Sequence, residues 1–135
     1  MIGVVVCAHG PLAAAMVDSV QMIVGEFPAL AAVGIHAGDA MEAILERLRE
    51  AIAHVDQGSG VLVLCDMFGG TPSNLSLSFL SDDIEVITGV SLPMLLKLYT
   101  HRDQPLSEVA QSVAEYARQN TLVAGQLLRS KGKAP

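Results

Sequence analysis

The chain has 135 residues, about the size of one ordinary domain, and 51% of them are hydrophobic, so we expect a single domain over residues 1–135 with a substantial core. Eight basic and fourteen acidic side chains give a formal net charge of −6, which argues against a nucleic-acid partner because phosphate backbones require a concentrated basic face. Charges or glycines interrupt every apolar run before it reaches the roughly 18 to 20 residues of a membrane span, so we expect no membrane insertion. The first residues enter a strand rather than a secretory signal, which predicts a cytoplasmic protein.

The first elements are predicted from apolar patterning. Residues 2–8 form a continuous apolar run, which is typical of a strand covered on both faces. A helix is predicted from Pro11 to about Val24, with proline in its first turn and Gly25 as its stop. Its apolar stripe comprises Leu12, Met16, Val20 and Ile23.

A short strand near residues 32–36 and a second helix are predicted next. Asp39 is expected to cap this helix, with Glu42 as the reciprocal member of a capping box. The expected buried face comprises Met41, Ile44, Leu45, Leu48 and Ile52.

After a glycine-rich turn at residues 57–60, residues 61–65 are predicted to form the third strand. Thr71 and Pro72 are expected to cap and open the next helix. The apolar residues expected on it are Leu75, Leu77, Phe79 and Leu80.

The last predicted elements are a strand at 84–88, a helix that starts at Ser91 and Pro93 and runs through Tyr99, and a helix that starts at Pro105. Strands therefore alternate with helices four times, which predicts an α/β fold: an open, mostly parallel sheet of four or five strands with helices on both faces.

The segment at residues 121–128 fits either a continued helix or an edge strand. Exchange of this apolar segment between two copies would cover it, so we expect a homodimer in which a C-terminal edge strand could be exchanged.

His9 and Asp66 each follow a buried strand directly, and glycine and proline come soon after each. If the two strands are parallel neighbours, both side chains emerge at the carboxyl edge of the sheet, where open α/β folds bind ligands. A metal site is disfavoured because the sequence has no short-spaced ligand pair. A hydrolase is disfavoured because Thr71 and Ser73 are better explained as helix-opening residues. The glycine pattern lacks the features of a P-loop, which disfavours a nucleotide site.

A phosphoryl-accepting histidine explains more of these residues at once. Such a histidine needs a solvent-facing imidazole nitrogen, an acceptor for its other nitrogen and donors for the phosphoryl oxygens. Asp66 can be the acceptor, and if it holds Nδ1–H then Nε2 is the attacking nitrogen. The expected donors are the main-chain N–H groups around Gly10, Gly69, Gly70 and Thr71. This chemistry requires no cofactor and no metal.

Met67 and Phe68 lie in the loop after Asp66, and we expect them to form an exposed apolar contact for a docking partner.

Three segments, at residues 2–10, 66–74 and 89–94, resemble the signature segments of the enzyme IIA domain of the mannose-type sugar phosphotransferase system. The similarity covers nearly the whole chain. It implies that His9 accepts a phosphoryl group from the phosphocarrier protein HPr and passes it to a histidine of a IIB component, with Asp66 as the orienting partner.

Two departures accompany the resemblance. Phe68 stands where many relatives have tryptophan, and Ala8 stands where a hydroxyl residue is frequent. Many relatives also continue through a linker into a IIB domain, whereas this sequence ends at Pro135, so we expect the IIB component on a separate chain.

Two alternatives stay open. One is a phosphoryl donor subunit for dihydroxyacetone kinase, which shares the fold and the early histidine but normally lacks the Asp-x-x-Gly-Gly pattern. The other is a regulatory binding module that phosphorylation of His9 switches between partners. The sugar cannot be deduced, because sugar choice belongs to the membrane components.

Overall fold

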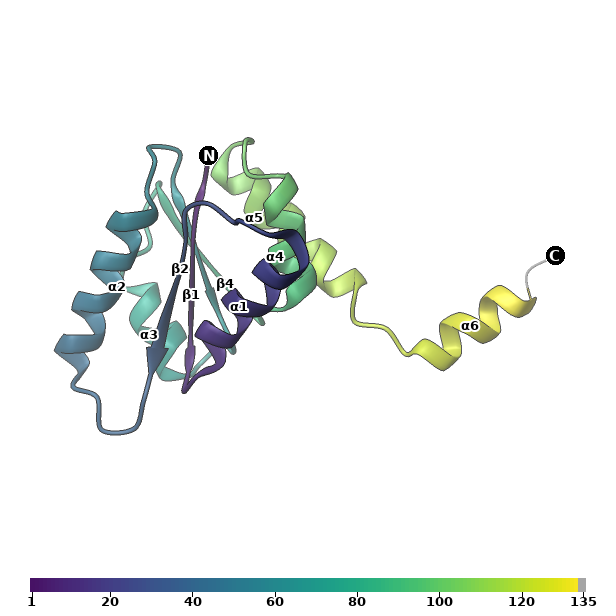
Figure 1. Ribbon diagram of the computed structural model, residues 1–135, viewed down its shortest axis with the longest axis horizontal. Coiled ribbons are helices and arrows are strands. Elements are labelled where there is room, and N and C mark those ends of the chain that lie inside the picture. Colours follow the sequence, from purple (N-terminus) through teal and green to yellow (C-terminus); the bar gives the residue numbers. More distant parts are fainter. Residues whose placement is uncertain (134–135) are drawn as a thin grey trace.

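The computed structural model describes residues 1–133, so the last two residues of the expected domain lie outside the described range. Strands and helices alternate along the chain, as predicted (Figure 1). The elements are β1 (Gly3–His9), α1 (Leu12–Val24), β2 (Leu30–Ile35), α2 (Met41–Val55), β3 (Val61–Cys65), α3 (Thr71–Leu77), β4 (Ile84–Thr88), α4 (Leu92–Thr100), α5 (Leu106–Gln119) and α6 (Ala124–Lys133).

The four strands form one parallel sheet in the order β2-β1-β3-β4. The expectation of an open parallel sheet is thus confirmed, with four strands among the described residues. β1 and β3 are its inner strands and are paired with Cys7 opposite Cys65. Both strands are apolar and almost completely buried, which explains why their sequences show no alternation.

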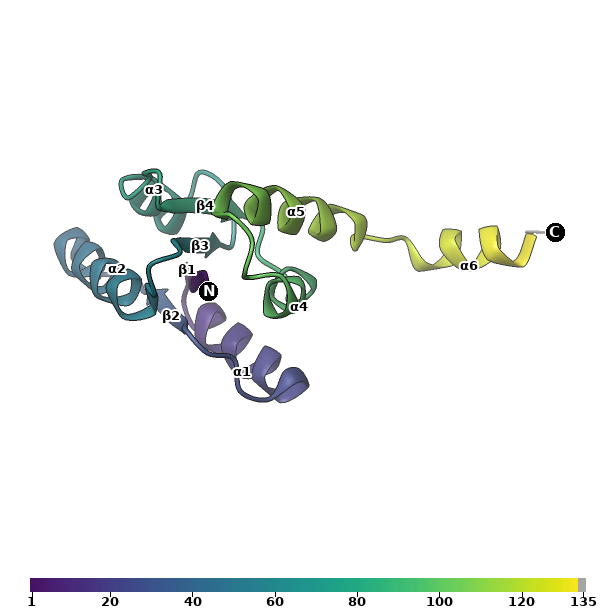
Figure 2. The ribbon, with the colours of Figure 1, turned by 90° about the horizontal axis from the view of Figure 1, so that it is seen from above.

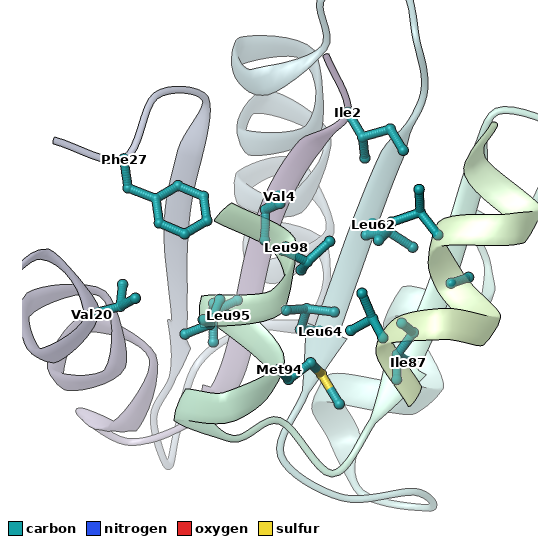
Figure 3. Packing of buried hydrophobic residues seen from close by; sticks show 14 of the residues in the cluster. Ile2, Val4, Val20, Phe27, Leu62, Leu64, Ile87, Met94, Leu95 and Leu98 are labelled. Carbon is teal, nitrogen blue, oxygen red and sulfur yellow. The ribbon is translucent and has the colours of Figure 1, made fainter. Parts of the chain in front are cut away.

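Helices cover both faces of the sheet, with α2 and α3 on one face and α1, α4 and α5 on the other (Figure 2). On the second face, Met94, Leu95 and Leu98 of α4 pack with inner-strand residues such as Val4 and Leu64 (Figure 3). The sheet is therefore held between two apolar layers, and the connecting loops lie at the ends of its strands.

The start of α2 differs from the prediction. Ala40 occupies the N-cap position, and Asp39 turns back to accept hydrogen bonds from the His36 N–H at 2.9 Å and from Arg47 at 2.8 Å. The capping box is therefore wrong, because a charge-assisted bond to arginine holds the carboxylate in the preceding loop. Met41, expected on the buried face, is 63% exposed.

The other helix starts agree in part. Leu12 and Ile23 of the predicted α1 stripe are exposed, whereas Val20 is buried. Gly70 occupies the N-cap position of α3, so the predicted cap at Thr71 is wrong. The cap of α4 is confirmed, because the Ser91 hydroxyl accepts from the N–H of Met94 at 3.3 Å.

Helix α3 is also shorter than predicted. It ends at Leu77, so Phe79 and Leu80 follow it rather than lie on it.

The ambiguous C-terminal segment forms a separate helix. Residues 121–123 leave α5, and α6 projects away from the body (Figure 1). The helical alternative therefore fits the described residues better than an edge strand. None of the helices described over residues 1–133 is both long and apolar enough to cross a membrane.

Arg102 ties distant segments together at the amino end of β1. Its guanidinium donates to the carbonyls of Ile2 at 2.8 Å, Pro28 at 2.6 Å and Ala29 at 3.1 Å, and the residue is only 4% exposed. The ring of Phe27 lies beneath the guanidinium, 4.9 Å away. A buried cation is tolerated here because main-chain carbonyls take the place of water.

Candidate functional site

The site begins with two residues that adjacent strands bring together. His9 is the last residue of β1, and Asp66 directly follows β3. Because these strands are parallel neighbours, both side chains leave the sheet at the same edge. The His9 Nδ1 and Asp66 Oδ2 atoms are 2.7 Å apart, so the predicted juxtaposition is present.

Asp66 is held by more than the imidazole. Its Oδ2 also accepts the main-chain N–H of His9 at 3.0 Å, and its Oδ1 accepts the N–H of Met67 at 3.0 Å. Partial burial raises the pKa of Asp66, but the bonds from the His9 main chain and ring lower it more, and the net pKa is below its ordinary value. The carboxylate is therefore charged at neutral pH.

The protonation of the ring follows from this charge. An ionised carboxylate only accepts hydrogen bonds, so Nδ1 of His9 carries the proton, and Nε2 of the neutral ring keeps its lone pair. The His9 side chain is 49% exposed and that of Asp66 13%, which leaves the imidazole open to solvent above a largely covered carboxylate. The arrangement supplies a nucleophilic nitrogen at the surface.

The backbone after His9 is fixed by strand β2. Gly10 has a φ of 58°, a conformation that favours glycine, and its N–H donates to Ile35 at 2.8 Å. A Cβ on Gly34 would lie 2.8 Å from the Gly10 carbonyl oxygen. Gly34 thus permits the close approach of the two segments. Sequence analysis overlooked it, although a glycine inside a strand is a known sign of such an approach.

Gly69 and Gly70, the glycine pair, lie beside the imidazole of His9. Gly69 has a φ of 91°, and a Cβ on Gly70 would lie 2.9 Å from Cε1 and 3.4 Å from Nε2 of His9. A tight turn and a close approach to the histidine therefore both require glycine here, one at each position.

Two of the four expected amide donors already have partners. The N–H of Gly10 donates to Ile35, and that of Gly69 donates to the Ser73 hydroxyl at 2.9 Å. Within residues 1–133, the amides of Gly70 and Thr71 have no acceptor. The donors available to an anion next to His9 are therefore Gly70 and Thr71 rather than all four residues.

Met67 and Phe68 form an apolar rim beside this site. They are 53% and 73% exposed, as expected for a contact surface, and Leu12 at the start of α1 is 39% exposed. In the part of the chain that the structure describes, no three His, Cys, Asp or Glu side chains gather as metal ligands would. Cys7 and Cys65 lie in the core beneath the site, where hydrogen bonding to Cys65 and burial raise the pKa of Cys7.

Solved structures with this fold include EIIA proteins. The chain superimposes on the EIIA component from Streptococcus agalactiae with a TM-score of 0.83 at 24% identity, over 93% of this chain and 99% of that one. A mannose/sorbose-specific IIA subunit from Enterococcus faecalis gives a TM-score of 0.82 over 90% of this chain and 93% of that one, also at 24% identity. These likenesses establish the fold.

Sequence comparison goes further. The chain is 31% identical to the fructose-specific EIIA component of Bacillus subtilis over 131 residues, which is 95% of this chain and 90% of that protein. It is 32% identical to the mannose-specific EIIAB component of Escherichia coli over 104 residues, 76% of this chain but only 32% of that longer protein.

The family model described as "PTS system fructose IIA component" matches residues 3–116, which include both members of the His9–Asp66 pair. With a relative that is similar over almost its full length and a sheet edge arranged as described, the chain belongs to the fructose, mannose and sorbose type of EIIA components of the phosphotransferase system (PTS).

Proposed function

We propose that His9 is the phosphoryl acceptor of this EIIA component, that it is loaded by phospho-HPr, and that it passes the group to a IIB component on a separate chain. The observation that carries the proposal is the 2.7 Å contact between His9 Nδ1 and Asp66, which leaves Nε2 as the exposed nucleophile. Asp66 fixes the ring tautomer and stabilises the positive charge that the ring gains on phosphorylation.

Transfer is an in-line displacement at phosphorus. The Nε2 lone pair of His9 forms the new N–P bond, and the N–P bond of phospho-HPr breaks with its electron pair returning to the HPr imidazole. Nδ1 keeps its proton and its bond to Asp66 throughout. The free amides of Gly70 and Thr71 supply donors for the phosphoryl oxygens. Passage to IIB is the same displacement, with His9 as the leaving group.

Partner docking is assigned to the rim around the ring. Met67 and Phe68 offer apolar area directly beside His9, so a partner that covers them also brings its own histidine to Nε2. No cofactor takes part in this chemistry, and the whole range 1–135 is proposed as one phosphocarrier domain in the cytoplasm.

A homodimer is proposed on separate grounds. Leu127 and Leu128 of α6 are exposed on a helix that also carries Arg129 and Lys131. A groove between β4 and α5 is lined by acidic residues and by the apolar edge of the sheet. The acidic residues of this groove are Glu85, Glu108 and Glu115. Arg118 also lines the groove and pairs with Glu115 at 3.1 Å, which leaves Glu85 and Glu108 as the acidic partners for the basic residues of α6. Insertion of α6 from a second copy would place its leucines against the apolar sheet edge and its basic residues near these two carboxylates.

The acceptor is tested by labelling. The protein is incubated with phosphoenolpyruvate labelled in its phosphoryl group, enzyme I and HPr, and acid-labile label is measured on the wild type, His9→Ala and His101→Ala. We expect label on the wild type and on His101→Ala, because His101 follows α4 at the opposite end of the sheet, and none on His9→Ala. Label retained by His9→Ala, or an unlabelled wild type beside an active control carrier, would refute the proposal.

A further inference from the structure

Ser73 is a buried hydroxyl that sequence analysis assigned only to helix opening. It is 0% exposed on the first turn of α3. A buried hydroxyl needs hydrogen-bond partners, and both partners of Ser73 belong to the glycine pair. Its Oγ accepts the N–H of Gly69 at 2.9 Å and donates to the carbonyl of Gly70 at 3.1 Å. One side chain therefore fixes two consecutive residues of the loop.

Asn74 reinforces the same arrangement. Its main-chain N–H donates to the Gly70 carbonyl at 2.9 Å, and its side-chain amide donates to the Gly69 carbonyl at a longer 3.4 Å. Gly69 has a φ of 91° and no Cβ, so the loop would be among the most mobile of the chain without these bonds. Of the two side chains, that of Ser73 forms the shorter bonds, 2.9 and 3.1 Å against 3.4 Å for the Asn74 amide, so it is the stronger side-chain anchor of the loop.

The glycine pair in turn limits the His9 ring. Asp66 holds the ring at Nδ1, and Gly70 lies beside the Cε1 and Nε2 atoms, where a Cβ would come within 2.9 Å of Cε1. A single hydrogen bond at Nδ1 leaves the ring free to swing about that contact. The backbone of Gly70 blocks this motion on one side, so the direction of the Nε2 lone pair depends on where the loop holds Gly70.

We propose that Ser73 is a positioning residue that acts through Gly70 to hold the His9 imidazole in the orientation for attack on phosphorus. The inference rests on the proposed function for its effect on transfer. Its structural part concerns the unphosphorylated protein alone. Correct orientation of a nucleophile has a large effect on rate, whereas partner binding depends on the rim and not on the buried hydroxyl.

The chain offers a matched control in Ser76. This residue is also 0% exposed on α3, but its hydroxyl donates to the Pro72 carbonyl at 2.6 Å and contacts Cys65, away from the glycine pair. Ser73→Ala and Ser76→Ala therefore remove equal groups with similar burial from the same helix. Ser73→Cys, which keeps the volume and weakens the hydrogen bonds, serves if Ser73→Ala is poorly folded.

The experiment has two readouts. Initial rates of phosphoryl transfer from phospho-HPr are measured over a range of HPr concentrations, and NMR of the unphosphorylated protein records the Cε1–Hε1 signal of His9. For Ser73→Ala we expect kcat to fall about tenfold with an unchanged KM for HPr, and the His9 signal to shift and broaden. For Ser76→Ala we expect both readouts to remain close to the wild type.

The outcomes separate the two proposals. Wild-type protein that takes no label refutes the proposed function, and the NMR signal then still decides whether Ser73 holds the ring. A His9 signal in Ser73→Ala that matches the wild type, or an equal change in Ser76→Ala, overturns the positioning role while leaving His9 as the acceptor.

Discussion

At the scale of single residues, the imidazole of His9 is placed by contacts of two kinds. The charged carboxylate of Asp66 bonds to Nδ1. Gly70 has no Cβ, so its backbone can lie close to Cε1 and Nε2. The contact with Asp66 was predictable, because the carboxyl ends of adjacent parallel strands lie at the same edge of a sheet. The bonds of Ser73 and Gly10 were not, because they depend on loop dihedral angles that apolar patterning does not encode.

Replacing Asp66 by asparagine tests the charge at this position. The folded-state pKa of Asp66 is depressed, so its ionised form contributes stability that is fully present above the unfolded pKa and is lost as pH falls through the folded pKa. We expect Asp66→Asn to be less stable than the wild type at neutral pH by on the order of 1 kcal/mol. Urea unfolding at a series of pH values should show this difference shrinking toward acid. A difference that does not vary with pH would contradict the assignment.

The same variant should be slower in phosphoryl transfer. An asparagine amide can present either an oxygen or an N–H group to Nδ1, so the ring is no longer held in one tautomer. We expect transfer to His9 to slow by at least about tenfold in Asp66→Asn, with circular dichroism like that of the wild type. Equal transfer rates would show that the tautomer is controlled elsewhere.

Alanine substitutions at Gly69 and Gly70 should have different effects on stability and on transfer. Gly70 has ordinary dihedral angles, with φ −85° and ψ 171°, so Gly70→Ala adds no backbone strain but pushes a methyl group against the imidazole, which must move. Gly69 has open space around it but a φ of 91°, so Gly69→Ala loses about 1 kcal/mol through backbone strain. Thermal unfolding and labelling together test this, with the larger loss of transfer expected in Gly70→Ala. The opposite pattern would contradict the proposed packing.

At the scale of elements, the sequence predicted the strands more accurately than the ends of the helices. The run at residues 61–65 is apolar throughout and of strand length, which is typical of a strand buried on both faces. Helix ends are harder to predict, because a side chain that could cap a helix can form a stronger hydrogen bond with another group. Asp39 is a good capping residue by type, yet it bonds to Arg47 in the second turn of α2 and does not cap the helix. The sequence did not decide between a helix and a strand for the segment that forms α6. Its apolar residues Leu127 and Leu128 stay exposed in the described residues, so no packing partner fixes its conformation.

Arg102 provides a prediction at this scale, since it connects the start of β1, the loop before β2 and the segment after α4. A lysine keeps the charge but cannot reach three carbonyl groups from one head group. We expect Arg102→Lys to lower the free energy of unfolding by about 2 to 3 kcal/mol, measured in urea. The control is Arg49→Lys, on an exposed helical ion pair, where we expect almost no change. Similar losses in both variants would refute the role of Arg102.

At the scale of the whole molecule, the open question is what covers α6. We expect the wild type to sediment with twice the monomer mass of 14.2 kDa. The double variant Leu127→Glu, Leu128→Glu should sediment as a monomer, because charge on the apolar face opposes burial. Gln126→Glu, on the same helix, is the control and should remain a dimer. A wild type that is monomeric over a wide concentration range would rule out the exchange.

The central place of β1 has a consequence for how the site works. Every residue from Val4 to Ala8 is 0% exposed, and those from Val4 to Cys7 pair with strands on both sides, so this strand cannot open without loss of most of the fold. The amides just before His9 should therefore be among the slowest of the chain to exchange with deuterium. In the proposed transfer, the partner proteins would meet a histidine that is anchored to the least mobile backbone of the domain. Any adjustment on binding would then occur in the partner and in the loop that bears Met67 and Phe68.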